Sequence, residues 1–594
     1  MPYDSPLPIL LPPATLVPTF AEVIAQIPSW TWIPKKRRDD IASALTTAAR
    51  MLGMPPAAIP GDPAWLNERL FKRQPAAFGI RKGRARNIVS LIRAALRVVG
   101  QHAPDLRVHD ALPPAWAEVL EVVTNIGRNA ALTGFARFCA KACVMPAEVG
   151  DEHLAGFVAE RQATTLSAAN GERGRTLASA WNACVAAGLP GWPTQRLSAT
   201  PRRKPYTLPF TAFPESFQAD IARFREQIGG QGGRFVISNT AHQRLRPATV
   251  AMRVFSLRQA AGLLVQSGIP PEQLTSLRDL VQPLDRVMTV LDRLSEMQTA
   301  RTGEADPVGS QLAVVAETLR QVAIHHAKLD PDSTKRISDW ARQARGRRGE
   351  GLTRKNRDRL RALIQPRARA LVLHLPEELM RRAHAIGPGQ PGAGRLAMEA
   401  VALEILLNCP LRRASLLALR LDEHLQRLDP RRRRITHLVL QPDDMKNAIP
   451  FEWPLPAASA ALIEIYIRDF RPAVATPENP WLFPGQQGAL SGNQLSNRLV
   501  TTIEEETGVR LHLHLLRHFA AWLHLQAHPG AYEDVRRVLG HKSVETTIAH
   551  YIAFEAAAAA LRFDEVVLRE RQSTRAVAAA RWGKPKRQPK APRP

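Results

Sequence analysis

Prolines and glycines interrupt the first 330 residues at short intervals, and between them Ala, Leu, Val and Arg recur every three or four positions. That spacing places apolar side chains on one face of a helix, while proline and glycine end each element. The pattern therefore predicts a mainly helical region built from short helices. At 594 residues the chain also exceeds what one hydrophobic core organises, so we expect several domains.

One plan recurs in this region: a basic amphipathic helix, a break with proline, an intervening helix and a second basic amphipathic helix. Two copies span residues 35–100 and 127–188, and a third, longer copy spans 245–329. Amphipathic helices also resemble one another by chance, and that alternative stays open. If the repeat is genuine, each unit is a small helical domain with a basic helix free to face phosphates.

The charge of the chain is strongly positive, with 81 Lys and Arg against 54 Asp and Glu, a net charge of +27. The excess is not confined to a tail but is spread over 35–38, 81–97, 334–372, 430–434 and 566–593. A long electrostatic footprint of this kind indicates a polyanionic partner, and nucleic acid is the leading candidate.

The chain contains only four cysteines, too few for a disulfide framework or a four-ligand zinc site. Cys139 and Cys143 stand one helical turn apart, which suits core packing and, as an alternative, a shared metal. The first 20 residues lack a basic leader and contain several prolines, and no run reaches the ~18 apolar residues of a membrane span. We expect a reduced, cytoplasmic protein without a signal peptide or a membrane partner.

Two segments have the composition of linkers. Residues 201–240 are rich in Gly and Pro, and residues 333–372 carry Arg or Lys on nearly every turn. The basic segment is either solvated or follows a nucleic-acid backbone. From about residue 373 the pattern becomes mixed, with helices, one small hairpin and then more helices. The elements expected there are helices at 394–410, 414–426, 454–472, 493–508, 512–526 and 531–541, strands at 431–441 and 448–456, and a turn at 443–447.

The chemistry-bearing residues concentrate in LHLHLLRHFAAWLHL (511–525) and RRVLGHKSVETTIAHYIAF (536–554). These segments contain His514, Arg517, His541 and Tyr551. A phosphodiester is shielded by its own charge, so an enzyme that attacks it needs fixed cations, a nucleophile and a proton donor for the leaving oxygen. The four residues supply most of that set.

Residues 395–555 resemble the catalytic domain of the tyrosine recombinase, or phage integrase, family. The family's first arginine matches Arg412 in PLRRASLLALRL, with Arg413 as the competing choice, and its hairpin lysine matches Lys446 in DDMKNAIPF. The rest of the pattern follows in order: the HxxRH box is HLLRH, LGHKS supplies His541, and Tyr551 comes ten residues later.

The resemblance implies a multidomain, mainly α protein. Helical DNA-binding units of the SAM-like core-binding type would precede a mixed α/β tyrosine-recombinase catalytic domain with a small β-hairpin or sheet. The expected divisions are helical modules at 1–110 and 111–200, a linker at 201–240, a core-binding-like clamp at 241–332, a basic linker at 333–372, the catalytic domain at 373–570 and a disordered basic tail at 571–594.

The residue types suit the implied roles. Arg412 and Arg517 are planar, permanently charged forks that match the two non-bridging oxygens of a phosphate. Tyr551 would be the nucleophile and form a covalent phosphotyrosyl bond, which conserves the energy of the phosphodiester, so that no ATP, metal or other cofactor is expected. Lys446 would protonate the leaving 5′-oxygen.

His514 and His541 would orient the phosphate and assist proton transfer. Their neighbours His512, His518 and His550 suit packing or phosphate contact, with metal binding as an alternative. One departure concerns Ser415, which stands where the family often has an acidic residue three positions after its first arginine. Support for Arg412 must then come from elsewhere.

The function expected from the resemblance is site-specific recombination of double-stranded DNA, as the integrase or transposase of a mobile element in a bacterial nucleoid. Partners would include further copies of the chain, in a homotetramer on paired sites, and accessory DNA-bending or co-recombinase proteins. A helix at 555–570 would dock on a neighbouring copy or on its own domain. A type IB topoisomerase and a non-catalytic DNA-binding protein remain the competing interpretations.

Overall fold

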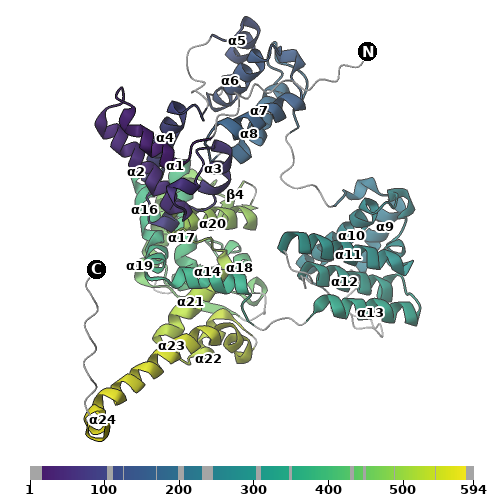
Figure 1. The fold of residues 1–594 in the computed structure, drawn as a ribbon. Coiled ribbons are helices and arrows are strands. Elements are labelled where there is room, and N and C mark those ends of the chain that lie inside the picture. The colour runs from purple at the N-terminus through teal and green to yellow at the C-terminus, as the bar shows by residue number, and fades with distance from the viewer. Residues whose placement is uncertain are drawn as a thin grey trace. The chain divides into compact units, whose positions relative to one another are not determined.

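The computed structural model describes most of the chain. The described residues are 17–102, 111–124, 126–168, 170–198, 207–229, 245–302, 310–346, 351–427, 434–445, 450–486, 488–541 and 543–582. The chain forms two compact units, one made of Met1–Thr200 with Glu350–Pro594 and the other of Pro201–Gly349. Helices dominate both units (Figure 1), which confirms the mainly α prediction. None of the helices in the described ranges combines the length and apolar character needed to cross a bilayer.

The first part of the larger unit contains α1 (Phe20–Gln26), α2 (Lys35–Leu52), α3 (Pro63–Leu70) and α4 (Lys82–Val98). Asp62 caps α3, since its carboxylate accepts hydrogen bonds from the amides of Ala64 and Trp65. Helices α2 and α4 bury their apolar faces in one core, which contains Leu45 of α2 and Ile92 of α4. Their outer faces keep the basic residues exposed, among them Arg84 and Arg86 on α4.

The second part contains α5 (Pro114–Glu121), α6 (Ile126–Lys141), α7 (Asp151–Thr164) and α8 (Asn170–Ala186). Its core is aromatic, with Trp181 in contact with Phe135 and Trp192. The second part is joined to the first by polar contacts. The side-chain Nδ2 of Asn67 donates to the Thr165 carbonyl at 2.8 Å, and Arg93 Nε donates to the Leu166 carbonyl at 2.7 Å.

The smaller unit contains α9 (Glu215–Gly229), α10 (Pro247–Gln266), α11 (Leu284–Thr302), α12 (Ser310–Gln321) and α13 (Pro331–Arg345). Helix α9 lies within residues expected to form a linker. Its Phe217, Ile221 and Phe224 are spaced three and four apart and are buried in the core of this unit. The Gly- and Pro-rich composition on either side of α9 therefore masked a helix, while the predicted module boundaries stay predictions.

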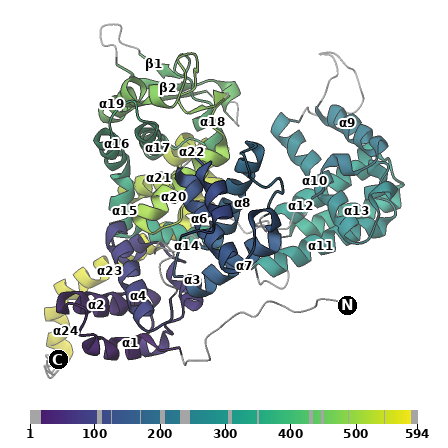
Figure 2. The same ribbon diagram turned by 90° about the horizontal axis from the view of Figure 1, so that it is seen from above.

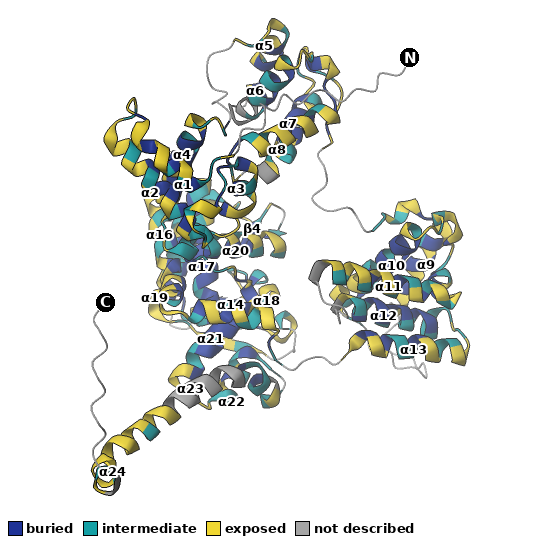
Figure 3. Ribbon diagram, viewed as in Figure 1, coloured by how far each residue is buried: buried dark blue, intermediate teal, exposed yellow. Residues whose placement is uncertain are grey.

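The region from α14 to α24, residues 354–582, is built around α17 (Pro391–Asn408), which is buried over most of its surface (Figure 3). Helices precede and follow it: α14 (Arg354–Ile364), α15 (Pro366–Leu373), α16 (Leu375–Ile386), α18 (Arg413–Leu417), α19 (Ala457–Ile465), α20 (Gly492–Thr507), α21 (Leu513–Ala527), α22 (Tyr532–Leu539), α23 (Val544–Ser573) and α24 (Arg575–Trp582).

A small antiparallel sheet interrupts these helices, in the order β1 (Leu425–Gln426), β2 (His437–Leu440), β3 (Phe451–Pro454). Leu438 pairs with Trp453, which confirms the expected hairpin. The sheet lies beside α19 (Figure 2), where the Glu464 carboxylate accepts a hydrogen bond from the Ile435 amide at 2.7 Å. A two-stranded ribbon, β4 (Pro484–Gly485) with β5 (Gly488–Ala489), precedes α20.

Two expectations in this region were wrong. Residues 414–426 do not form one helix, because α18 ends at Leu417 and the chain turns into β1. His424 holds this turn: its Nδ1 accepts from the Arg420 amide at 2.9 Å and its Nε2 meets Asp444 Oδ2 at 3.1 Å. The tail expected to be disordered from 571 contains α24, whose RAVAAARW sequence favours helix, and residues 583–594 lie outside the described part.

The basic segment at 333–372 is also mostly helical. Its C-terminal half forms α14 and α15, and Leu360, Leu363 and Val372 are buried in the same core as α17. The apolar residues lie at helical spacing beneath the arginines, and their burial outweighs the charge on the other face.

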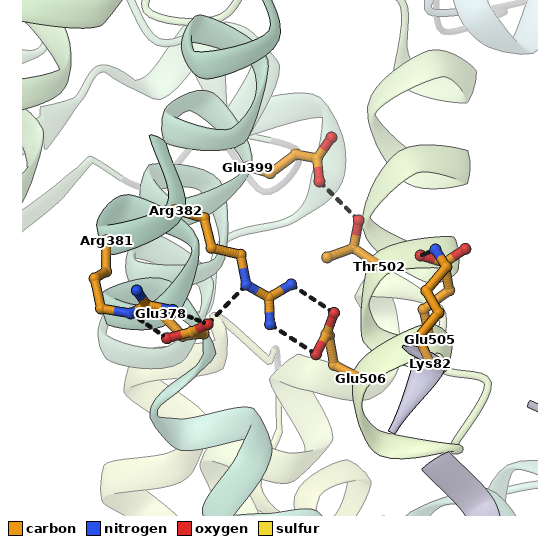
Figure 4. Close-up of polar contacts among 8 residues, drawn as sticks. All are labelled: Lys82, Glu378, Arg381, Arg382, Glu399, Thr502, Glu505 and Glu506. Atoms are coloured by element: carbon orange, nitrogen blue, oxygen red, sulfur yellow. Dashed lines mark hydrogen bonds and ion pairs between the residues drawn. The ribbon is translucent and has the colours of Figure 1, made fainter. Parts of the chain in front are cut away.

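Residues of the first part also contact α20 within the larger unit. Lys82 Nζ lies 3.0 Å from Glu505 Oε2, and a Cβ added to Gly508, the left-handed residue that ends α20, would lie 2.3 Å from Ala77 Cα. Arg382 of α16 bridges Glu378 and Glu506 beside this contact (Figure 4), at 2.7 Å from an oxygen of each. The α20 helix is thus held by α16 on one side and by the first part of the chain on another.

Candidate active site

Helix α21 carries three of the candidate polar residues. His514, Arg517 and His518 are spaced at i, i+3 and i+4, so they share one face of the helix. Leu515, Leu516 and Phe519 occupy the other positions and are buried in the core. Packing of α21 into that core therefore directs the polar face toward the elements that follow it.

Arg517 is 5% exposed and joins two segments that lie far apart in the sequence. Its Nη2 donates to the Leu539 carbonyl at 2.7 Å, and its Nη1 donates to the Pro410 carbonyl. Burial, and then the charge of Arg412, lower the pKa of the guanidinium to about 10. It remains cationic near neutral pH, held between the end of α22 and the segment before α18.

Arg412 stands at the N-cap of α18 and is half-buried. Its Nη2 donates to the Gly540 carbonyl at 3.4 Å, and burial lowers its pKa. The competing Arg413 is exposed and lies beside Gly492, where an added Cβ would be 3.2 Å from its Nε. Of the two arginines, Arg412 is the one that lies close enough to Arg517 to lower its pKa.

His541 follows Gly540, the left-handed residue that ends α22. Its Nδ1 lies 2.8 Å from Thr547 Oγ1, a side chain with no exposed surface. Burial, with the nearby charge of Arg517 as the next cause, lowers the pKa of His541 to about 4. The ring is therefore neutral at physiological pH.

Tyr551 lies in the first turns of α23 and is 1% exposed. Its ring packs against an apolar cluster that includes Leu525, Val535 and Leu539. The hydroxyl lies 2.7 Å from Nδ1 of His518. Burial raises the pKa of the phenol, and Arg517 opposes that rise in part.

His518 is the residue whose position the sequence did not predict. Sequence reasoning left it among histidines suited to packing, phosphate contact or metal binding, whereas its ring lies between Tyr551 and His514. Its place in HLLRH, four positions after His514, was a signal that both share a face. The contact with Tyr551 depends on how α23 packs on α21, which residue spacing does not indicate.

The remaining candidates are less closely tied to this cluster. Ser415 Oγ donates to the Asp444 carbonyl at 3.2 Å and so fastens α18 to the hairpin rather than to Arg412. Lys446 lies outside the described residues. His512 is exposed, and His550 stacks on His518 with ring centroids 5.5 Å apart. Among the described residues, no group of three or more His, Cys, Asp or Glu is placed to hold a metal.

The C-terminal region is similar to known proteins. The model of the phage integrase family matches residues 378–557. A tyrosine recombinase XerC from Chromohalobacter salexigens is 29% identical over 189 residues, which cover 31% of this chain and 58% of the relative. The chain thus spans 58% of the length of that curated relative.

Solved structures of similar proteins include an XerH site-specific recombinase bound to difH substrate, 15% identical, with a TM-score of 0.26, covering 57% of this chain and 94% of that one. A Tn1549 transposon integrase in complex with transposon right-end DNA is 15% identical, with a TM-score of 0.28, covering 58% of this chain and 98% of that one. Residues 378–557 are thus similar to the phage integrase family and to the tyrosine recombinase XerC.

Proposed function

We propose that this protein is a site-specific DNA recombinase that cuts and rejoins DNA through a covalent bond between Tyr551 and a 3′-phosphate. The observation that carries the proposal is the meeting of two arginines, three histidines and a tyrosine from separate elements. Arg412 and Arg517 supply two fixed cations, and the tyrosine is the nucleophile-bearing member of the set. Such preorganised charge lowers the barrier of a step that concentrates negative charge on phosphate oxygens.

In the proposed reaction the Tyr551 oxygen attacks phosphorus while the bond to the 5′-oxygen breaks. Arg412 and Arg517 hold the non-bridging oxygens, each worth about 3–4 kcal/mol by analogy with a single oxyanion donor. Lys446 delivers the proton to the leaving oxygen, a role that rests on the resemblance alone. The phosphotyrosyl bond keeps the energy of the phosphodiester, so a 5′-hydroxyl from another strand reverses the reaction without ATP or metal.

We assign the helical modules at 1–110, 111–200 and 241–332 to DNA binding. Support comes from the net charge of +27 and from exposed basic side chains such as Arg84 and Arg86. Strand exchange between two duplexes needs more than one active site, so we propose a homotetramer on paired sites, with accessory DNA-bending or co-recombinase proteins.

The test is to trap covalent complexes on genomic DNA under denaturing conditions and to sequence the attached ends. Wild-type protein should yield a defined set of sites, and Tyr551→Phe should yield none although it still binds DNA. Equal yields from both proteins would sink the enzymatic assignment and favour a non-catalytic DNA-binding protein. Relaxation of supercoiled plasmid without joining of paired sites would favour a topoisomerase instead.

A further inference from the structure

His518 occupies the space between the tyrosine and the histidine of the HxxR pair. Its Nδ1 lies 2.7 Å from the Tyr551 hydroxyl, and its Nε2 lies 3.2 Å from Nε2 of His514. The His518 and His514 rings meet edge to face, 4.7 Å between centroids and 82° between planes. Both nitrogens of one imidazole therefore have a partner, and the three groups form a continuous chain.

Hydrogen-bond chemistry allows this chain one direction that carries a proton away from Tyr551. Burial keeps Tyr551 protonated, so its hydroxyl has a hydrogen to give, and in the direction that a transfer requires it donates and His518 Nδ1 accepts. A neutral imidazole that accepts at Nδ1 carries its hydrogen on Nε2, which then donates to Nε2 of His514. His518 is neutral because burial, followed by the charges of its neighbours, lowers its pKa to about 2.

The surroundings leave few other routes for the phenolic proton. Tyr551 is 1% exposed, so bulk water has little access to its hydroxyl, and direct loss of the proton to solvent is slow. The charged and titratable groups around His518 come from every packed element: Arg517 and His514 from α21, His550 and Tyr551 from α23, and His541 from the segment between α22 and α23. None of these is a carboxylate, and together they disfavour an imidazolium that stays at His518.

His514 is the exposed end of the chain. Its side chain is open to solvent although the surrounding protein, Arg517 and His550 lower its pKa. A proton delivered to His514 can therefore pass to water, whereas one left at His518 would stay in a buried, positively charged environment. The geometry thus suits transfer outward along the three groups.

We propose that His518 relays the proton of Tyr551 to His514 as the tyrosine attacks. The inference rests on the proposed recombinase function. The bond from Tyr551 oxygen to hydrogen breaks as the bond from that oxygen to phosphorus forms, and the proton moves to His518 Nδ1. In the same event the hydrogen on His518 Nε2 passes to His514, which releases its own excess proton to solvent, so charge and protons balance.

The substrate is a DNA site recovered by trapping with the wild-type protein. The experiment measures how the rate of covalent-complex formation on this DNA depends on pH. His518→Gln is the informative variant, because its carbonyl can accept from Tyr551 and its amide can donate to His514, but it cannot pass a proton. We expect cleavage to fall about 100-fold. In the variant we expect the rate to rise about tenfold per pH unit as hydroxide replaces the relay, with a flatter profile in the wild type. The exposed His528→Gln is the matched control at the end of the same helix.

His518→Ala with added imidazole separates the relay from packing. Recovery of the rate with imidazole, at an unchanged thermal midpoint, supports proton transfer. A wild-type rate and pH profile in His518→Gln would overturn the relay, as would a loss that is equal at every pH and not rescued by imidazole.

A second readout does not require cleavage. Nitrogen-15 NMR of the full chain reports the protonation of each ring nitrogen, and the His518 signal is assigned by its loss in His518→Gln. From about pH 5 to about pH 8, the range over which a free histidine titrates, His518 should stay neutral with its hydrogen on Nε2. A ring protonated at Nδ1 would overturn the inference. Absence of any covalent complex from the wild type, with the expected tautomer present, would count against the recombinase function and not against the hydrogen-bond chain.

Discussion

Lys82 and Glu505 form an ion pair, with Nζ 3.0 Å from Oε2, although 423 positions separate them in the sequence. The pair is largely solvent-exposed, at 65% for the lysine side chain and 34% for the glutamate, so it contributes at most about 1 kcal/mol. The closer contact is that of Gly508 with the backbone of Ala77. Together they make the first helical part a fixed neighbour of α20.

Gly508→Ala should detach this contact. The residue has a φ of +76°, and its Cβ would lie 2.3 Å from Ala77 Cα, so the substitution adds left-handed strain and forces the backbone of Ala77 away. Gly53→Ala is the matched control, because Gly53 ends α2 at a φ of +69° with nothing within 4 Å of an added Cβ. We expect both to lose about 1 kcal/mol to strain, and only Gly508→Ala to speed proteolysis of residues 72–82. Equal proteolysis of the two variants would mean that the contact does not hold the first part in place.

Arg412→Ala should lower the cleavage rate about 10²–10³-fold while leaving DNA affinity largely intact, because the side chain acts on charge that develops during the reaction. Arg413→Ala removes the same charge from an exposed position one residue away. Its rate should stay within about twofold of wild type. The measurement is single-turnover cleavage, and a greater loss at Arg413 would reverse the assignment of the first arginine.

Acid should destabilise the larger unit through its buried histidines. His541 and His518 have pKa values lowered to about 4 and about 2, from the usual 6.5, so the unfolded chain binds protons that the folded protein does not. Their contribution to the free energy of unfolding is complete above pH 6.5 and is lost as the pH falls, toward about 4 for His541 and about 2 for His518, at most about 1.4 kcal/mol per pH unit for each. Urea unfolding at pH values from about 7.5 to about 4.5 measures how the free energy of unfolding depends on pH. We expect that free energy to fall less steeply with decreasing pH in His541→Asn than in the wild type. Removal of the exposed His528 controls for the loss of a histidine, and a parallel slope in His541→Asn would contradict the assignment.

Salt dependence tests whether the first module meets phosphates. Arg84 and Arg86 are exposed on α4, and replacing both by Gln should reduce the slope of log affinity against log salt by up to about two, since each phosphate contact contributes about 0.9. The control is Arg468→Gln, because Arg468 is already engaged by Asp469 at 2.7 Å. An unchanged slope in the double variant would assign α4 to protein contacts.

Much of the helical architecture followed from periodicity, because a buried helix such as α17 needs apolar residues at a fixed spacing. Composition gave the wrong prediction, a linker, where charged residues or glycines surround a helix with an apolar face. Phe217 and Phe224 of α9 and Leu360 of α14 are buried core residues within segments assigned to linkers. The opposite error arose at 414–426, where helical spacing continued past Leu417 but the bonds of His424 turn the chain into the sheet.

Part of the candidate site was predictable from the sequence, because residues that follow a known order along the chain can meet in the folded protein. The order of Arg412, Arg517, His541 and Tyr551 indicated one site, and contacts among their loops bring them together. The place of His518 was not predictable, because its bond to Tyr551 spans 33 positions and depends on how two helices pack. The same limit applies to Ser415, which stands where the family pattern suggests an acidic residue. Its hydroxyl donates a hydrogen bond to the Asp444 carbonyl beside the hairpin, a contact that the sequence does not indicate.

The order of the two compact units along the chain affects how DNA would be presented. Pro201–Gly349 is inserted in the sequence between Met1–Thr200 and Glu350–Pro594, so the smaller unit is tethered to the larger one at both ends. Two tethers restrict its excursions more than one would, and they raise the effective concentration of whatever it carries near the rest of the chain. The local concentration of any ligand held by the smaller unit therefore depends on the lengths of the two connections.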